Sequence, residues 1–211
     1  MTRITAAVCT EFGAPLTLET LTLRAPLAGE VQVALEAVAI CHSDISFAEG
    51  AWGGDLPAVY GHEAAGRVTA VGPGADLPIG QRVVVTLVRA CGTCPTCASG
   101  HPTRGQTPDT RGPKLTRDDG TPVTAAMECG AFAEQILVDR SQVVPLDDTI
   151  PPASAALLAC GVVTGVGAIV LAGRLRAGED VVVIGAGGVG LNAIQGARIA
   201  GARRIVAVDM T

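Results

Sequence analysis

The sequence has 211 residues, of which 48% are hydrophobic and 17% charged, and its formal net charge is −5. This length allows one or two domains, and the hydrophobic share is enough for a core and unlike that of a disordered chain. With five aromatic residues and no stripe of lysine or arginine, the chain lacks the stacking and phosphate-binding surfaces of a nucleic-acid partner, so we expect none.

The N-terminus, MTRITAAVCTEFG, lacks the basic start and apolar run of a secretory signal. We therefore expect a cytoplasmic protein. In that compartment the seven cysteines are expected to be metal ligands or thiols rather than disulfides.

The first 150 residues are predicted to be rich in β-structure. Apolar residues alternate along VQVALEAVAI, which predicts a strand at residues 31–40. Further strands are predicted at residues 4–9, 16–23, 66–71, 82–87 and 132–138. Short strands separated by Gly and Pro indicate a partly open barrel or a sandwich.

A group of possible metal ligands lies between the third and fourth predicted strands. Cys41 and Asp44 are followed, 18 residues after Asp44, by His62 and then Glu63. Cysteine and histidine suit Zn²⁺, and a carboxylate can orient a ligand imidazole. Taken singly, Cys41 and His62 are also typical of ordinary core positions, and that interpretation stays open.

Residues 89–127 are polar, rich in Pro and Gly and without periodicity, which predicts a surface lobe. The lobe contains three cysteines at intervals of three residues: Cys91, Cys94 and Cys97. Two interpretations remain open, a metal site and three thiols in a loop.

Residues 153–173 form an uncharged run of 21 residues. This length is enough to span a bilayer, and Gly161 and Gly165 have the spacing of a helix-dimer face. The run consists mostly of small residues and has no flanking Trp or Tyr. We therefore favour a buried helix between sheets or domains, and no membrane partner.

The last 31 residues have the pattern of a dinucleotide-binding unit. A strand at 181–184 leads into a glycine-rich turn, a helix to about residue 200 and a second strand at 205–208. The turn residues expected to approach a pyrophosphate are Gly185, Gly187, Gly188, Val189 and Gly190. Asp209 lies 19 residues past Gly190, where a carboxylate binds ribose hydroxyls and favours NAD over NADP. An ordinary glycine-rich turn is the alternative.

Together these motifs resemble those of the zinc-containing medium-chain alcohol dehydrogenases. The resemblance rests on ICHSD at 40–44, GHEAAGRVTAVGPGA at 61–75, ACGVVTG at 159–165 and GAGGVG with Asp209, in the family's order. It implies an α/β fold with a β-rich part. Residues 1–160 would be a GroES-like catalytic domain, and residues 161–211 an incomplete Rossmann domain with a parallel, doubly wound sheet.

The resemblance also implies roles for single residues. The ligands of a catalytic zinc ion would be Cys41, His62 and Cys160. Ser43 would hydrogen-bond the substrate hydroxyl and carry its proton, Asp44 would orient His62, and Glu63 would be a carboxylate near the zinc. His42 would contact the cofactor pyrophosphate, and Thr164 would lie near the nicotinamide.

The sequence departs from the family in two places. Ser46 stands where many relatives have the histidine that ends the proton relay, and Gly105 stands where the lobe of a structural zinc needs its fourth cysteine. Cys91, Cys94 and Cys97 would be the ligands of that zinc, and because the fourth ligand is missing we expect weak binding or none. Trp52 is a candidate for shaping the substrate pocket, and Ala126 and Met127 are weaker candidates.

The predicted function is reversible oxidation of an alcohol to an aldehyde or ketone, with zinc and NAD as cofactors. Two alternatives remain: a formaldehyde dehydrogenase of the same family that acts on a thiol adduct, and a non-catalytic protein that binds zinc or a dinucleotide. Because a complete dinucleotide fold has about six parallel strands and only two are predicted here, we expect these residues alone to be inactive. The full-length parent is expected to be a homo-oligomer.

Overall fold

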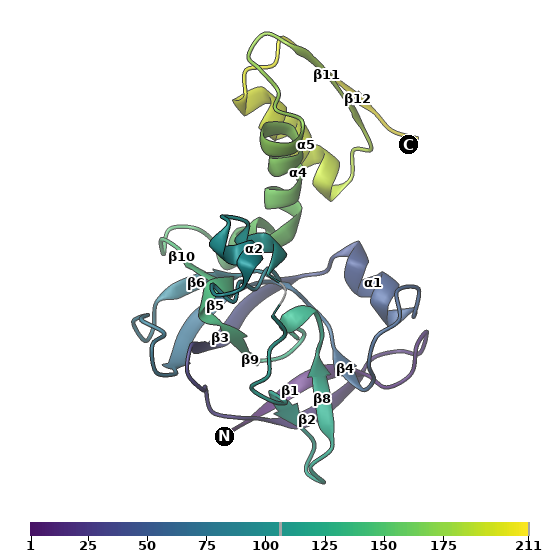
Figure 1. The fold of residues 1–211 in the computed structure, drawn as a ribbon. Helices are drawn as coiled ribbons and strands as arrows, with labels where there is room; N and C mark the ends of the chain where they lie inside the picture. The colour runs from purple at the N-terminus through teal and green to yellow at the C-terminus, as the bar shows by residue number, and fades with distance from the viewer. Residues whose placement is uncertain (106, 211) are drawn as a thin grey trace. The chain divides into compact units, whose positions relative to one another are not determined.

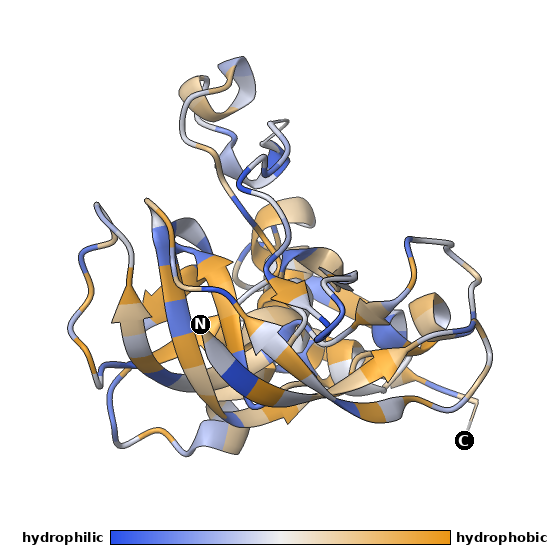
Figure 2. Ribbon diagram, turned by 90° about the horizontal axis from the view of Figure 1, so that it is seen from below, coloured by the Kyte–Doolittle hydropathy of each residue, from blue (hydrophilic) through white to orange (hydrophobic). Residues whose placement is uncertain are grey.

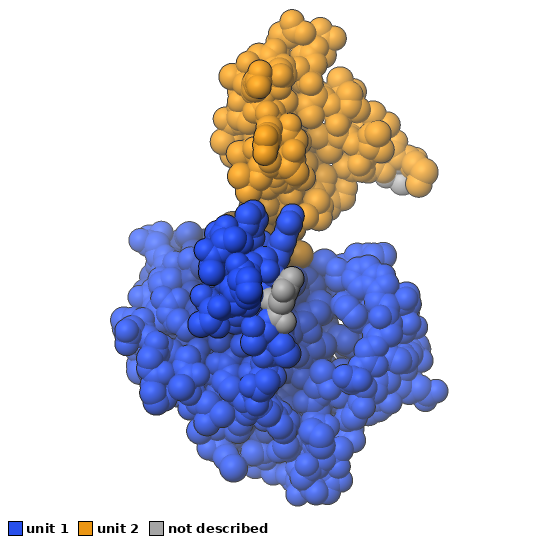
Figure 3. Space-filling model, in the orientation of Figure 1, with its two compact units in different colours: residues 1–156 blue, residues 157–211 orange. Residues whose placement is uncertain are grey.

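The computed structural model describes residues 1–105 and 107–210, and the chain divides into two compact units. Unit 1 comprises Met1–Ala156 and unit 2 comprises Leu157–Thr211, as coloured in Figure 3. Each unit has its own sheets, so the two are described separately.

The first sheet of unit 1 is a closed five-stranded barrel (Figure 1). Its strands, in spatial order, are β1 (Thr2–Cys9), β2 (Thr17–Leu23), β7 (Leu115–Thr116), β8 (Pro122–Ala125) and β4 (Ala58–Val59). Strands β1 and β2 are antiparallel, with Ile4 opposite Leu21. Ile4, Ala6 and Val8 alternate along β1 and are all buried in the barrel core, which is why an alternating sequence forms this strand.

The second sheet of unit 1 has five antiparallel strands. In spatial order they are β10 (Val143–Pro145), β6 (Arg82–Val85), β5 (Glu63–Val71), β3 (Glu30–Ala39) and β9 (Gln135–Asp139). Hydrophobic residues are frequent on the strands, where they are interspersed with hydrophilic ones (Figure 2). The short helices of unit 1 are α1 (His42–Ala48), α2 (Pro95–Ala98), η1 (Pro102–Arg104), η2 (Ala126–Glu128) and η3 (Arg140–Gln142).

The structure confirms the six strands predicted for the β-rich region, within a few residues at each end. The predicted surface lobe is wrong for its second half, because β7 and β8 belong to the barrel. Leu115 and Val123 are paired across these two strands and are buried in the barrel core. The barrel is also closed rather than partly open.

The apolar run at the junction of the units is helical, with two π-helical turns. Its segments are α3 (Pro152–Leu157), η4 (Leu158–Val162), α4 (Val163–Gly167) and η5 (Ala168–Ala172). By length and composition it is long and apolar enough to cross a membrane. Only 22% of its most apolar window is buried among the described residues, so the prediction of a buried helix is wrong there.

The rest of unit 2 is the predicted strand–helix–strand unit. Strands β11 (Asp180–Ile184) and β12 (Arg204–Val208) are parallel, and helix α5 (Gly188–Ile199) connects them. Two parallel strands joined through a helix are the repeating element of a doubly wound sheet, as the glycine-rich motif predicted.

A buried ion-pair network connects Glu30, the first residue of strand β3, to Asp109 and Arg111. The Glu30 carboxylate is fully buried and accepts hydrogen bonds from Arg24 at 2.6 and 2.8 Å and from the Leu27 N–H at 2.7 Å. Burial raises the pKa of Glu30, but these hydrogen bonds outweigh it and the pKa lies below its usual value. Arg111 extends the network to Asp109 and Asp139.

We predict that Glu30→Gln lowers the free energy of unfolding at pH 7 by about 3 kcal/mol, because it leaves the Arg24 charge without its buried partner. A carboxyl whose pKa is lowered by folding stabilises the protein above its unfolded pKa of about 4.3. This stabilisation is lost as the pH falls through the lower folded pKa. The difference from wild type should therefore shrink below about pH 4.

Urea unfolding at several pH values measures this difference, with the exposed Glu11→Gln as a control that should match wild type. A deficit in Glu30→Gln that stays the same from pH 7 to pH 3 would contradict the assigned role of Glu30.

Candidate functional site

The Asp44 carboxylate links two segments of unit 1 that are distant in the sequence. Asp44 lies in the first turn of α1, and its Oδ2 accepts a hydrogen bond from the Cys41 N–H at 2.9 Å, which fixes the start of the helix. Its Oδ1 accepts from the Gly61 N–H at 2.9 Å and lies 3.1 Å from His62 Nδ1. Asp44 is only 2% exposed, so one buried carboxylate orders both Cys41 and His62.

The turn that presents His62 requires glycine at position 61. Gly61 has a φ of +94°, and a Cβ there would lie 2.7 Å from the Phe132 backbone nitrogen. No other residue type fits this close approach. The backbone of Gly61 and Tyr60 pairs with residues 131 and 132, so the turn is fixed on both sides.

His62 is 1% exposed, and its two ring nitrogens have different surroundings. Nδ1 faces the Asp44 carboxylate, which can only accept, so Nδ1 carries the proton of the neutral ring. Nε2 therefore has a lone pair, yet this atom is buried and has no hydrogen-bond partner. A buried nitrogen acceptor without a partner is costly unless a metal ion fills its place.

Cys41 and Glu63 complete a group of donors around this nitrogen. One ligand atom each of Cys41, His62 and Glu63 lies within 4.8 Å of the others. The Ser43 hydroxyl is 3.6 Å from Cys41 Sγ. Sulfur, imidazole and carboxylate donors in one cluster fit Zn²⁺, which takes such ligands at about 2.0–2.3 Å. These four residues and Asp44 are the predicted site residues that unit 1 brings together.

In unit 2, the glycine-rich turn has the predicted form. A Cβ on Gly190 would lie 1.8 Å from the Gly185 carbonyl oxygen, so α5 can begin this close to β11 only with glycine at position 190. Asp209 follows β12, and its Oδ2 accepts a hydrogen bond from the Ala186 N–H at 2.5 Å. The acidic side chain therefore stands beside the turn that would hold a pyrophosphate.

The other residues predicted to belong to the site are His42 and Trp52 in unit 1 and Cys160 and Thr164 in unit 2. In unit 1, His42 is the first residue of α1 and is exposed. Trp52 is 59% exposed and packs edge-on against Phe47, with ring centroids 5.1 Å apart. In unit 2, Cys160 Sγ lies 4.0 Å from Thr164 Oγ1.

The three cysteines of the lobe also converge. Their sulfur atoms lie within 4.8 Å of one another, and Cys91 Sγ is 3.8 Å from Cys97 Sγ. Among residues 1–105 and 107–210, no fourth His, Cys, Asp or Glu joins this group. The lobe therefore does not fit a closed structural zinc site, which needs four ligands.

Two further features of unit 1 were not predicted from the sequence as a whole, although Ala126 and Met127 were named as pocket candidates. One is an apolar cluster in which Met127 and Ala126 pack with Phe47 around Tyr60. Burial raises the pKa of Tyr60 to about 12, and its hydroxyl donates to the Phe47 carbonyl at 3.3 Å. Met127 has a φ of +53°, so this segment is also strained. No periodic signal in the sequence marks this cluster.

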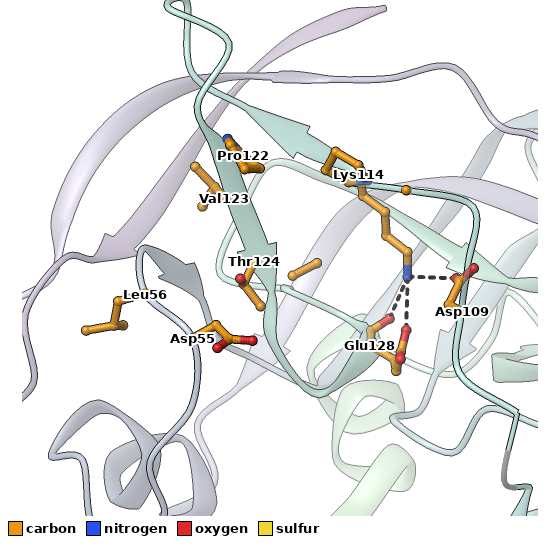
Figure 4. A pocket seen from close by; sticks show the side chains of 11 residues that line it. Asp55, Leu56, Asp109, Lys114, Pro122, Val123, Thr124 and Glu128 are labelled. Atoms are coloured by element: carbon orange, nitrogen blue, oxygen red, sulfur yellow. Dashed lines mark hydrogen bonds and ion pairs between the residues drawn. The ribbon is translucent and has the colours of Figure 1, made fainter.

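The other missed feature is a cavity of about 410 Å³ beside strand β8 (Figure 4). Its lining includes Lys114, the only lysine of the chain, whose Nζ lies 3.5 Å from Glu128 and 3.9 Å from Asp109. Lys114 also donates to the Glu128 carbonyl at 3.2 Å, next to the strained Met127. The rarity of lysine in the sequence is the one signal that singles out this residue.

Comparison with known proteins agrees with the motifs. Residues 27–148 match the model of the alcohol dehydrogenase GroES-like domain. The NDMA-dependent alcohol dehydrogenase of Amycolatopsis methanolica is 38% identical over 97% of this chain and 57% of its own length. The S-(hydroxymethyl)glutathione dehydrogenase of Paracoccus denitrificans is 36% identical over 99% of this chain and 58% of its own.

A solved structure is similarly close. The alcohol dehydrogenase zinc-binding domain protein of Burkholderia ambifaria is 36% identical, with a TM-score of 0.93 over 100% of this chain and 60% of its own. The chain therefore belongs to the alcohol dehydrogenase family with a GroES-like domain, which confirms the predicted family and fold class. It spans 57–60% of the length of these relatives.

We predict that Asp44→Asn weakens zinc binding about 10- to 100-fold, the usual cost of losing a partner that orients a ligand histidine. The amide NH₂ of the asparagine would face the Cys41 N–H, the Gly61 N–H or His62 Nδ1, which are themselves donors. Competition with a chromophoric chelator measures the affinity, and the exposed Asp76→Asn serves as the matched control. Equal zinc affinity in Asp44→Asn and wild type would show that Asp44 does not position His62.

Proposed function

We propose that this chain belongs to an enzyme that oxidises alcohols reversibly to aldehydes or ketones with zinc and NAD. The observation that carries the proposal is the buried, unpartnered Nε2 of His62 beside Cys41 and Glu63, in a chain of the alcohol dehydrogenase family. When bound, zinc would lower the pKa of the alcohol hydroxyl and NAD would accept the hydride.

We propose Cys160 as the third protein ligand, with Cys41 and His62. Cys160 lies in the π-helical turn η4, and π-turns are frequent at functional sites. It follows Ala156 by four residues, and Ala156 packs in the core of unit 1 against Ala65, close in the chain to Glu63. Three protein ligands leave an open position for substrate, which a catalytic zinc site needs.

The residues around this centre have distinct proposed roles. Asp44 holds the His62 ring so that Nε2 is available as a ligand. Ser43 hydrogen-bonds the substrate hydroxyl and passes its proton outward. Ser46 cannot act as a base at neutral pH, so water or another group completes the transfer. Glu63 adds negative charge beside the metal.

The proposed domain division assigns residues 1–160 to catalysis and residues 161–211 to the start of the dinucleotide-binding domain. The glycine-rich turn from Gly185 to Gly190 would hold the pyrophosphate, with His42 as a second contact and Thr164 near the nicotinamide. We also propose a cytoplasmic, homo-oligomeric enzyme that binds neither membrane nor nucleic acid. The absence of a stripe of lysine or arginine in the sequence supports the last point.

A thiol adduct of formaldehyde is a second candidate substrate. The similarity to the S-(hydroxymethyl)glutathione dehydrogenase of Paracoccus denitrificans supports it. An assay of formaldehyde with and without glutathione, beside a panel of simple alcohols, separates the two substrate classes. Turnover only with glutathione and formaldehyde would favour the second.

We predict that Cys160→Ser, like Cys41→Ser, loses the zinc ion of this centre, because a serine hydroxyl is a poor zinc ligand. Zinc per chain, measured by elemental analysis after gel filtration, should fall from about one to near zero. The matched control is Cys129→Ala, since the Cys129 thiol is buried and donates to the Thr86 carbonyl instead. Full zinc retention in Cys160→Ser would overturn the proposed ligand set.

We predict that Asp209→Ala weakens NAD binding by about 10-fold or more, since hydrogen bonds to a charged group contribute about 1.5–3 kcal/mol. Binding of NADP should become stronger, because the carboxylate that repels its 2′-phosphate is gone. Calorimetric titration with both dinucleotides gives the two affinities. An unchanged ratio of NAD to NADP affinity would contradict the role proposed for Asp209.

A further inference from the structure

The lobe of unit 1 holds three thiols in a group that lacks a fourth donor. Cys91 Sγ and Cys97 Sγ are 3.8 Å apart, and both residues are partly exposed. Cys94 differs from them in burial, because it is only 7% exposed. The accessible pair is therefore Cys91 and Cys97.

Position 105 explains why this group is open. A Cβ built on Gly105 would lie 3.4 Å from Cys97 Sγ and 3.5 Å from the Cys91 nitrogen, so a side chain there would face the thiols. The φ of Gly105 is −54°, which any residue adopts, and these distances are ordinary van der Waals contacts. The lobe is one side chain short of a closed four-thiolate site, and nothing in the backbone prevents that side chain.

We propose that the lobe is an oxidative modification site, in which Cys91 and Cys97 form an intramolecular disulfide when a hydroperoxide reaches them. Three thiolates without a fourth protein ligand hold zinc only loosely, so the metal does not protect the sulfurs. Two partly exposed thiols on a short loop need only shorten their separation from 3.8 Å to about 2.05 Å.

The reaction needs one hydroperoxide and two thiols. The thiolate of one cysteine attacks an oxygen of hydrogen peroxide, the O–O bond breaks, and a sulfenic acid and hydroxide form. The sulfur of the second cysteine then attacks the sulfenic sulfur, and water leaves as the S–S bond forms. Both thiols together lose two electrons, hydrogen peroxide gains them, and the net products are the disulfide and two waters.

The sequence makes this modification easy to measure. Cleavage after Arg89 and Arg104 releases one peptide, residues 90–104, that contains all three lobe cysteines and neither Cys41 nor Cys160. The purified protein is treated with a small excess of hydrogen peroxide and then alkylated. In the reduced protein this peptide carries three alkyl groups, and after oxidation it should carry one, on Cys94.

Three variants make the test specific. Cys97→Ser should abolish the disulfide, whereas Cys94→Ser should keep it. Gly105→Cys, in the presence of zinc, should slow the oxidation about 10-fold or more, because four thiolates close the site. Zinc at the Cys41 centre does not enter this readout, so failure of the proposed enzyme activity would leave the result interpretable.

Two results would overturn the proposal. One is a peptide that still carries three alkyl groups after peroxide treatment, with or without zinc retained by the lobe. The other is a disulfide that includes Cys94 in the wild-type protein.

Discussion

The candidate metal centre depends on one buried carboxylate. Asp44 accepts hydrogen bonds from Cys41 and Gly61 and faces Nδ1 of His62, so it fixes the start of α1, the turn before β5 and the His62 ring at once. A buried carboxylate with three donors is satisfied electrically and geometrically, which makes this arrangement rigid before any metal binds. Asp44 therefore holds the His62 ring in an orientation in which Nε2 is buried and has no hydrogen-bond partner.

Some features of the fold and of the candidate site could be predicted from the sequence, because they have a periodic pattern or a recognisable motif, and others could not. Apolar residues alternate along strand β3, so periodicity predicted it. Strands β7 and β8 are too short for periodicity, and Leu115 and Val123 stand alone among polar residues. The candidate metal ligands of unit 1 were predicted through a family resemblance, and residue types alone left the alternative of core residues open. The pairing of Asp44 with Gly61 was not visible, because it depends on a three-dimensional turn.

Charged residues were the least predictable part. Arg24, Glu30 and Arg111 look in the sequence like solvated surface residues, yet the Glu30 carboxylate is fully buried between the two arginines. Hydrogen bonding to Arg111 lowers the pKa of Asp109 well below its usual range. The Asp109 carboxylate is therefore charged at neutral pH and paired with Arg111. Such networks have no periodic pattern, since their partners lie at irregular distances along the chain, from Asp109 beside Arg111 to Glu30 far upstream of it.

The same network explains how the lobe tolerates Gly105. In a small zinc-stabilised lobe, metal binding supplies folding energy, and loss of one ligand would be expected to loosen the whole segment. Here Arg111 pairs with Asp109 at 2.8 Å and with Asp139 at 2.8 Å, so the chain that leaves the lobe is anchored to strand β9 by charge rather than by metal. Because these ion pairs anchor the segment, its folding does not require a metal bound to Cys91, Cys94 and Cys97. Oxidation of these thiols is therefore expected to leave the barrel folded.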